Sequence, residues 1–171
     1  MVSKQKRLNE LALLLQRPDA VIVTQAIELL REEEPFNGVI GLLADCYDSN
    51  KSTSVTKAIE GFMNDMKEKS LQPELMSEIR KNHKPATKGM LVASCWQSGI
   101  DYSEYCLDFA EAFLNNEYMV AIECLTVIEE SSGKLDQKTK KEIIKLIDGF
   151  SDLATDEKKP LINELKLILS V

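Results

Sequence analysis

Apolar residues recur every three or four positions along almost the whole chain, the spacing of one face of an α-helix. The first such stretch covers 4–16, and a second covers 20–34. Further helices are expected over 38–49, 52–66, 74–82, 88–97, 102–116, 117–130, 136–150 and 156–169. The pattern contains no convincing strand, so it predicts an all-α fold of about ten antiparallel helices.

Turn residues indicate where several of these helices begin or end. Asp19 follows Pro18 and is a candidate N-cap for the second helix. Gly133 is placed to take the left-handed conformation that often ends a helix. Asp156 is expected to cap the last helix, with Pro160 in its first turn.

Two helix pairs in the chain have similar sequences. They are GVIGLLADCYDSNKSTSVTKAIEGFMND, 38–65, and GMLVASCWQSGIDYSEYCLDFAEAFLNN, 89–116. At an offset of 49 residues, Leu42, Ala44, Cys46, Tyr47 and Ser49 align with Leu91, Ala93, Cys95, Trp96 and Ser98. After a two-residue difference in the loop, Glu60, Phe62 and Asn64 align with Glu111, Phe113 and Asn115. A duplicated helix pair is typical of α-helical repeat proteins.

Tandem antiparallel helix pairs at this spacing resemble the HEAT and armadillo-like α-solenoids. The resemblance extends from about Asp19 to the end, and Pro35 and Pro85 match the proline that HEAT repeats often carry early in the first helix. The Asp/Arg pair of those repeats has no clear counterpart here. The resemblance implies an α-α superhelix, a single domain over 1–171 and a protein-binding scaffold. The basic, aromatic groove of the HEAT-like alkylpurine DNA glycosylases is not matched in this chain.

The negative charge of the chain argues against partners that are themselves negatively charged. Its formal net charge is −7 and its pI is near 4.9, whereas phosphate binding needs clustered Lys and Arg. Nucleic acid and anionic membrane surfaces are therefore not expected as partners. The apolar run Leu11–Leu15 is too short for a secretory signal, and no stretch approaches the roughly 18 apolar residues of a membrane span. We expect a cytoplasmic protein that is a monomer or a weak homodimer.

The residue types that usually carry chemistry form no catalytic constellation. Cys46, Cys95 and Cys124 occupy matching places on apolar helix faces, so we expect reduced core residues. The single histidine, His83, lies between lysines in KNHKP and is expected to be a solvated surface residue. Carboxylates near in sequence, such as Glu129 with Glu130, lack the alternating loop spacing of a calcium site. No metal, cofactor or catalytic residue is predicted.

The most distinctive surface pattern lies between Gly89 and Gly133, where there is no Lys or Arg. The segment contains eight acids: Asp101, Glu104, Asp108, Glu111, Glu117, Glu123, Glu129 and Glu130. Like charges repel each other, and a basic partner would relieve that repulsion. The candidate partner-binding residues are an acidic helix face with two aromatic residues at its edge: Trp96, Asp101, Tyr102, Glu104, Asp108 and Glu111. Alternatively, Trp96 closes the core beside Cys95 and the acids only keep the surface soluble.

These observations predict a non-catalytic scaffold that binds a protein or a peptide, with Lys/Arg-rich segments as candidate partners. One alternative is an enzyme of unknown type on a helical-repeat scaffold, which would require a deep pocket with convergent polar groups. A second is a structural subunit that docks into a larger assembly through the apolar side of Leu161–Leu169 that is not used in packing.

Overall fold

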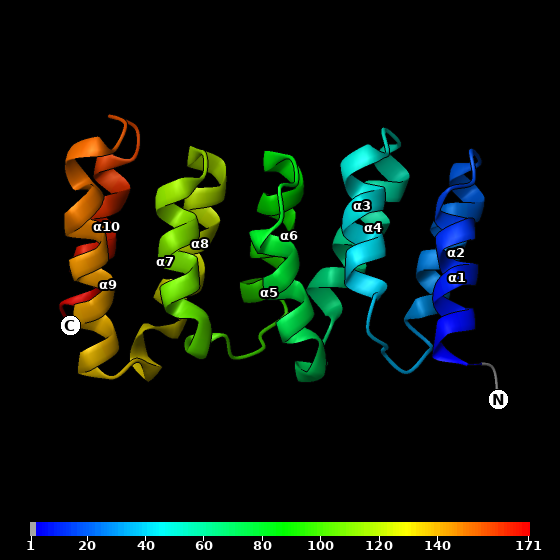
Figure 1. The fold of residues 1–171 in the computed structure, drawn as a ribbon, viewed down its shortest axis with the longest axis horizontal. Coiled ribbons are helices and arrows are strands. Elements are labelled where there is room, and N and C mark those ends of the chain that lie inside the picture. The colour runs from blue at the N-terminus through cyan, green and yellow to red at the C-terminus, as the bar shows by residue number, and fades with distance from the viewer. Residues whose placement is uncertain (1–2) are drawn as a thin grey trace. The chain divides into compact units, whose positions relative to one another are not determined.

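The computed structural model describes residues 3–171, and it confirms the all-α prediction (Figure 1). The helices are α1 Lys4–Leu15, α2 Ala20–Leu30, α3 Val39–Ser49, α4 Thr53–Asp65, α5 Gln72–Arg80, α6 Pro85–Gln97, α7 Cys106–Asn115, α8 Tyr118–Ser131, α9 Gln137–Phe150 and α10 Lys159–Leu169. Short 3₁₀ helices are η1 Lys69–Leu71, η2 Ser103–Tyr105, η3 Ser132–Lys134 and η4 Ser151–Leu153. Residues 3–171 contain no strand, and their successive helices are compatible with a helical repeat.

The chain divides into two compact units, Met1–Ser94 and Cys95–Val171, with the boundary inside α6. In unit 1, α1 packs against α2 and α3, α2 packs against α4, and α3 packs against α4 and α5. This arrangement buries most of the apolar stripes that the periodicity predicted, although Leu14, on the stripe of α1, is 40% exposed. Fully buried side chains in its core are Val23, Ile27, Ile40, Leu43, Val55, Ile59, Met63 and Leu75. The expectation of a single domain over 1–171 stays a prediction.

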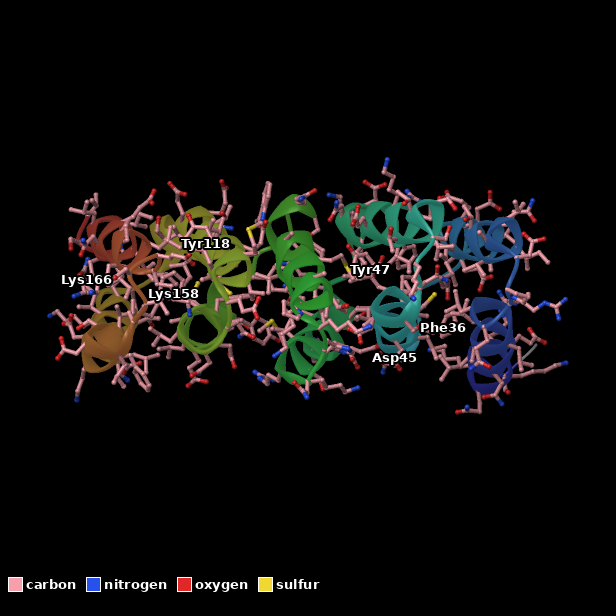
Figure 2. The ribbon with its side chains drawn as sticks, turned by 90° about the horizontal axis from the view of Figure 1, so that it is seen from above. Phe36, Asp45, Tyr47, Tyr118, Lys158 and Lys166 are labelled. Atoms are coloured by element: carbon pink, nitrogen blue, oxygen red, sulfur yellow. The ribbon has the colours of Figure 1, made fainter. Side chains whose placement is uncertain are left out.

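In unit 2, α7 packs against α8 and α9, and α10 packs against α8 and α9. Its fully buried core comprises Cys106, Phe109, Phe113, Cys124, Ile128, Ile143, Ile147 and Leu165. Two buried lysines join parts of this unit that are distant in sequence. Lys158 donates hydrogen bonds of 3.0 Å to the main-chain oxygens of Phe113 and Leu114, and Lys140 donates one of 2.8 Å to the main-chain oxygen of Val171. Figure 2 shows Lys158 between the two C-terminal helices, α9 and α10, and the pair α7 and α8.

Two of the predicted helix ends are wrong. Gly133 lies within η3 and its φ is not positive, because the chain continues as a right-handed turn after α8. The positive-φ residues among 3–171 are instead Gly38 and Gly99. The last helix begins at Lys159, and Asp156 does not cap it but pairs with the Lys159 ammonium at 2.7 Å. Pro160 does lie in the first turn of α10, as predicted.

Candidate functional site

The structure places Trp96 at the surface of unit 2 and fixes its orientation. The side chain lies near the end of α6 and is 37% exposed. Its indole Nε1 donates a hydrogen bond of 2.8 Å to the Oε2 atom of Glu123 on α8. A surface tryptophan that is held in this way loses little side-chain entropy when a partner covers it.

Trp96 meets α8 on the side of that helix that faces away from the core. Met119, Glu123, Thr126 and Glu130 follow each other there at the spacing of one helix face, whereas Val120, Cys124, Val127 and Ile128 are buried on the other side. Met119 is 65% exposed, and Tyr118 beside it is also exposed (Figure 2). We call the set Trp96, Met119, Glu123 and Glu130 the α8 face. Sequence analysis did not place Trp96 beside Glu123 because periodicity does not show which helices are neighbours.

Tyr102 does not have the exposed position that the sequence suggested. Its side chain is only 2% exposed, and its ring packs edge-on against Phe109 with centroids 6.2 Å apart. Its hydroxyl is buried beside the Cys95 thiol and makes no regular hydrogen bond within the described residues. Burial raises the pKa of Tyr102, so the side chain stays neutral. The left-handed Gly99 lies in the turn that returns the chain onto α7, and Tyr102 therefore belongs to the core.

The Asp101 side chain accepts a backbone hydrogen bond and forms an ion pair. Its carboxylate accepts a hydrogen bond of 3.0 Å from the Ser103 backbone nitrogen and lies 3.2 Å from the Lys134 ammonium. The hydrogen bonds from Ser103, together with Lys134, lower the pKa of Asp101 to about 2. Asp101 is thus a partly compensated charge at the start of η2.

The remaining predicted acids lie on η2 and α7. Glu104 and Glu111 are exposed, whereas Asp108 is half-buried. Asp108 and Glu111 are on the side of α7 away from the buried Phe109 and Phe113, and Glu104 precedes that helix. Trp96 makes its hydrogen bond to Glu123 on α8 instead.

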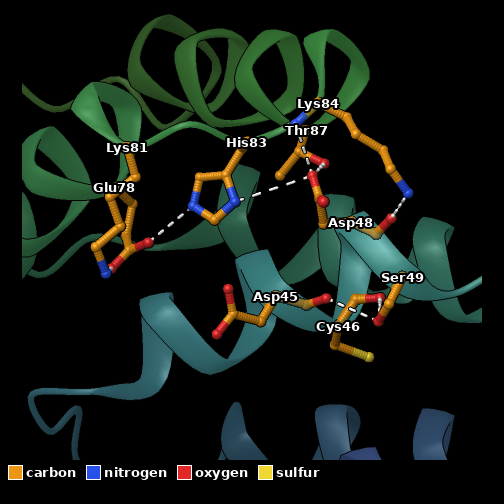
Figure 3. Close-up of polar contacts among 9 residues, drawn as sticks. All are labelled: Asp45, Cys46, Asp48, Ser49, Glu78, Lys81, His83, Lys84 and Thr87. Carbon is orange, nitrogen blue, oxygen red and sulfur yellow. Dashed lines mark hydrogen bonds and ion pairs between the residues drawn. The ribbon is translucent and has the colours of Figure 1, made fainter.

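Unit 1 contains a buried polar network that sequence reasoning missed (Figure 3). Glu78 of α5 is only 4% exposed, and its carboxylate lies 2.9 Å from His83 Nε2 and 2.5 Å from Lys81 Nζ. The other ring nitrogen of His83, Nδ1, lies 3.9 Å from Asp48 Oδ1 on α3. The His83 side chain is 8% exposed, so the prediction of a solvated surface histidine is wrong. Two carboxylates on neighbouring helices, which are far apart in sequence, enclose the imidazole.

Asp48 connects the end of α3 to the start of α6. Its Oδ1 atom accepts hydrogen bonds from the Lys84 backbone nitrogen at 2.8 Å and from Thr87 Oγ1 at 2.6 Å. The Lys84 ammonium in turn donates to the main-chain oxygen of Asp48 at 2.6 Å. Burial alone would raise the pKa of Asp48, but the hydrogen bonds from Thr87 and Lys84, together with the positive charge of Lys84 and the nearby His83, lower it.

This lowered pKa predicts a stability contribution that disappears in acid. A carboxyl group whose pKa is lower in the folded state stabilises the fold above its unfolded pKa, and the contribution is lost as the pH falls through the folded pKa. We expect Asp48→Asn to lower the free energy of unfolding by about 1 kcal/mol at neutral pH. The difference from wild type should shrink below about pH 4, close to the ordinary aspartate pKa. Urea unfolding at several pH values measures it, and a difference that is constant down to pH 2 would contradict the assignment.

Glu74, one turn before Glu78 on α5, supplies the N-cap that α3 lacks. The residue at the cap position is Gly38, with φ of 98° and no side chain. The Glu74 carboxylate accepts hydrogen bonds from the backbone nitrogens of Gly38 at 2.8 Å and Gly41 at 3.0 Å. A carboxylate at this position also interacts favourably with the helix dipole. In the sequence Asn37 looks like the natural cap for this helix, but the cap position is Gly38, so the role of Glu74 could not be predicted from local sequence.

These carboxylates also line an open pocket of about 590 Å³, which includes Asp45 and Lys81. Glu74 and Glu78 both make hydrogen bonds inside unit 1, and this explains their positions without a ligand. Among residues 3–171, no group of three or more His, Cys, Asp or Glu side chains could hold a metal ion.

The cysteines are core residues, as predicted. Cys46, Cys95, Cys106 and Cys124 are all buried and none forms a disulfide. Burial raises the pKa of the Cys106 thiol to about 11 and that of the Cys124 thiol to about 12. Reactivity depends on the thiolate form, so these thiols are poor nucleophiles.

Comparison with known proteins identified no relative: no family model, no curated protein and no solved structure matches the chain. Within the described part of the chain, no helix has the length and apolar character needed to cross a membrane.

Proposed function

We propose that this chain is a non-catalytic, HEAT-like helical-repeat module that binds a protein or peptide through the α8 face. The observation that supports this most directly is the exposed Trp96 indole held by Glu123. Tryptophan is among the residues most enriched at binding hot spots. The free, buried cysteines also fit a reducing compartment such as the cytoplasm.

The charge around Trp96 favours a basic partner. Glu123 and Glu130 lie on the α8 face, and residues 89–133 contain no Lys or Arg. A segment with Lys or Arg next to an apolar residue could pair with these acids while its apolar group contacts Trp96 and Met119. Such charge complementarity mainly increases the association rate and the specificity.

Trp96→Ala is expected to weaken partner binding about tenfold, because it removes a fixed aromatic contact. Affinity capture from native lysate identifies the partner, and calorimetric titration with the purified partner then measures the Kd.

Glu123→Lys should also weaken partner binding and reduce the dependence of the Kd on salt concentration. Leu29→Ala is the matched control, since Leu29 is an exposed apolar residue of unit 1. Circular dichroism establishes that each variant is folded.

The same titration separates the α8 face from the alternatives. The double variant Glu104→Lys with Glu111→Lys should leave the Kd within about twofold of wild type, since those residues lie on η2 and α7. A loss confined to this double variant would move the site to the α7 row. A partner bound equally by every variant would contradict the proposal and favour a structural subunit, for which Leu153 and Leu167 are exposed near the end of unit 2.

A further inference from the structure

Unit 1 contains a second candidate site, a pocket of about 330 Å³ where α2 and α4 end. Its apolar lining includes Phe36, Val39, Met66 and Leu71, which are all buried, and the half-buried Phe62. Phe36 belongs to the segment before α3 and is labelled in Figure 2. Ligand sites in proteins are commonly concave, largely apolar and of this size or larger.

The rim of this pocket is negative. Four carboxylates, those of Glu33, Glu34, Asp65 and Glu68, line it together with two cationic side chains, those of Arg31 and Lys67. The last residues of α2 and α4 lie in the lining as well, and neither helix has Lys or Arg in its last turn. Helix C-termini carry a partial negative charge, which adds to that of the carboxylates.

Arg31 is already neutralised within unit 1. Its guanidinium lies 3.1 Å from a Glu28 oxygen and 2.5 Å from Asp65 Oδ2. The same group lies close to Gly61 of α4, where an added Cβ would be 2.8 Å from Nη2. Glu33 is paired with Arg7 of α1. Glu34 and Glu68 are exposed at the rim.

We infer that this pocket binds a peptide segment that presents one bulky apolar side chain next to lysine or arginine. The buried lining would receive the apolar group, and Glu34 and Glu68 would pair with the flanking cations. The rim has four carboxylates against the cations of Arg31 and Lys67, and this charge balance disfavours a phosphate or a fatty-acid carboxylate. This site lies in unit 1 and does not depend on the proposed α8 face in unit 2.

Methionine-methyl NMR can test the site directly, because each candidate surface has its own methionine. Met66 lines the pocket, whereas Met119 lies on the α8 face. The probe is a synthetic peptide with a central phenylalanine flanked on each side by two lysines, added to the full chain at low ionic strength. The expected result is a saturable shift of the Met66 methyl signal, whatever happens at Met119.

Two control peptides and one pair of variants define the specificity of that shift. A peptide with alanine in place of phenylalanine, and one with glutamates in place of the lysines, should each bind at least about tenfold more weakly at Met66. The variant Glu34→Lys with Glu68→Lys should reduce affinity for the lysine peptide to a similar extent. Glu157→Lys with Glu164→Lys is the matched control, because it changes the net charge equally at exposed positions of unit 2.

The inference is overturned if the Met66 signal does not shift, or if the alanine peptide shifts it as strongly as the phenylalanine peptide. It is also overturned if the rim variant and the control variant bind the lysine peptide equally well. A shift confined to Met119 would support the α8 face and reject the pocket, so the two sites succeed or fail separately.

Discussion

Tyr102→Ala is expected to lower the free energy of unfolding by about 3–5 kcal/mol, the range for removal of a buried aromatic side chain. The ring is enclosed in unit 2 and packs edge-on against Phe109, so its loss would leave a cavity that the surrounding helices cannot fully fill. Urea denaturation followed by circular dichroism measures the change. The effect should be on stability, because the side chain has almost no surface to offer a partner.

Tyr102→Phe is the control that separates the ring from the hydroxyl. Since the hydroxyl is buried without a regular hydrogen bond in the described chain, its removal should change stability by less than about 1 kcal/mol and can increase it. Partner binding by this variant should match wild type. A fully stable Tyr102→Ala variant, or a Tyr102→Phe variant as unstable as the alanine variant, would disprove the assignment of the ring to the core.

Glu74→Ala is expected to lower the free energy of unfolding by about 2–3 kcal/mol. Hydrogen bonds to a charged group contribute about 1.5–3 kcal/mol each, and water can replace part of them here. The variant leaves the Gly38 and Gly41 nitrogens without the carboxylate that now accepts from both. We also expect faster amide hydrogen exchange at these two residues, which NMR measures residue by residue.

Two further variants test whether the carboxylate acts as a cap. Glu74→Gln keeps one acceptor oxygen but loses the charge and the second acceptor, so its stability should lie between those of wild type and Glu74→Ala. Glu68→Ala removes an exposed acid just before η1 and should change stability by less than about 0.5 kcal/mol. Unchanged exchange at Gly38 and Gly41 in Glu74→Ala would contradict the capping role.

The hydrophobic pattern was sufficient to predict the helices, and it failed where polar groups of different helices meet. The stripes on α4 and α9 correctly predicted Ile59, Ile143 and Ile147 as buried, because a helix with one apolar face must bury it. Phe150, at the end of the predicted α9 stripe, is instead 41% exposed. His83 shows the limit of this reasoning. Its sequence neighbours are lysines, but its environment comes from Glu78 and from Asp48, which belongs to a different helix. Local sequence contains no information about a partner as distant along the chain as Asp48.

The sequence was enough to predict the charge around the candidate site, but not which of its aromatic side chains are exposed. The lack of Lys and Arg around Trp96 and the position of the indole near a helix end were visible in the sequence, and the side chain is indeed partly exposed. Tyr102 looked equivalent because it also lies near a helix end. The difference between the two depends on the turn at Gly99 and on the packing against Phe109, neither of which leaves a periodic pattern.

The hydrogen bonds from Lys158 to the end of α7 have a consequence for how unit 2 unfolds. In a simple stack of repeats, each element depends only on its nearest neighbours, and the ends can unravel independently. Lys158 precedes α10 directly, yet it satisfies the carbonyls of Phe113 and Leu114, more than forty residues earlier in the chain. Detachment of the last helix would expose those carbonyls and loosen α7. The start of α10 and the end of α7 are therefore coupled, which favours cooperative unfolding over stepwise loss from the C-terminal side.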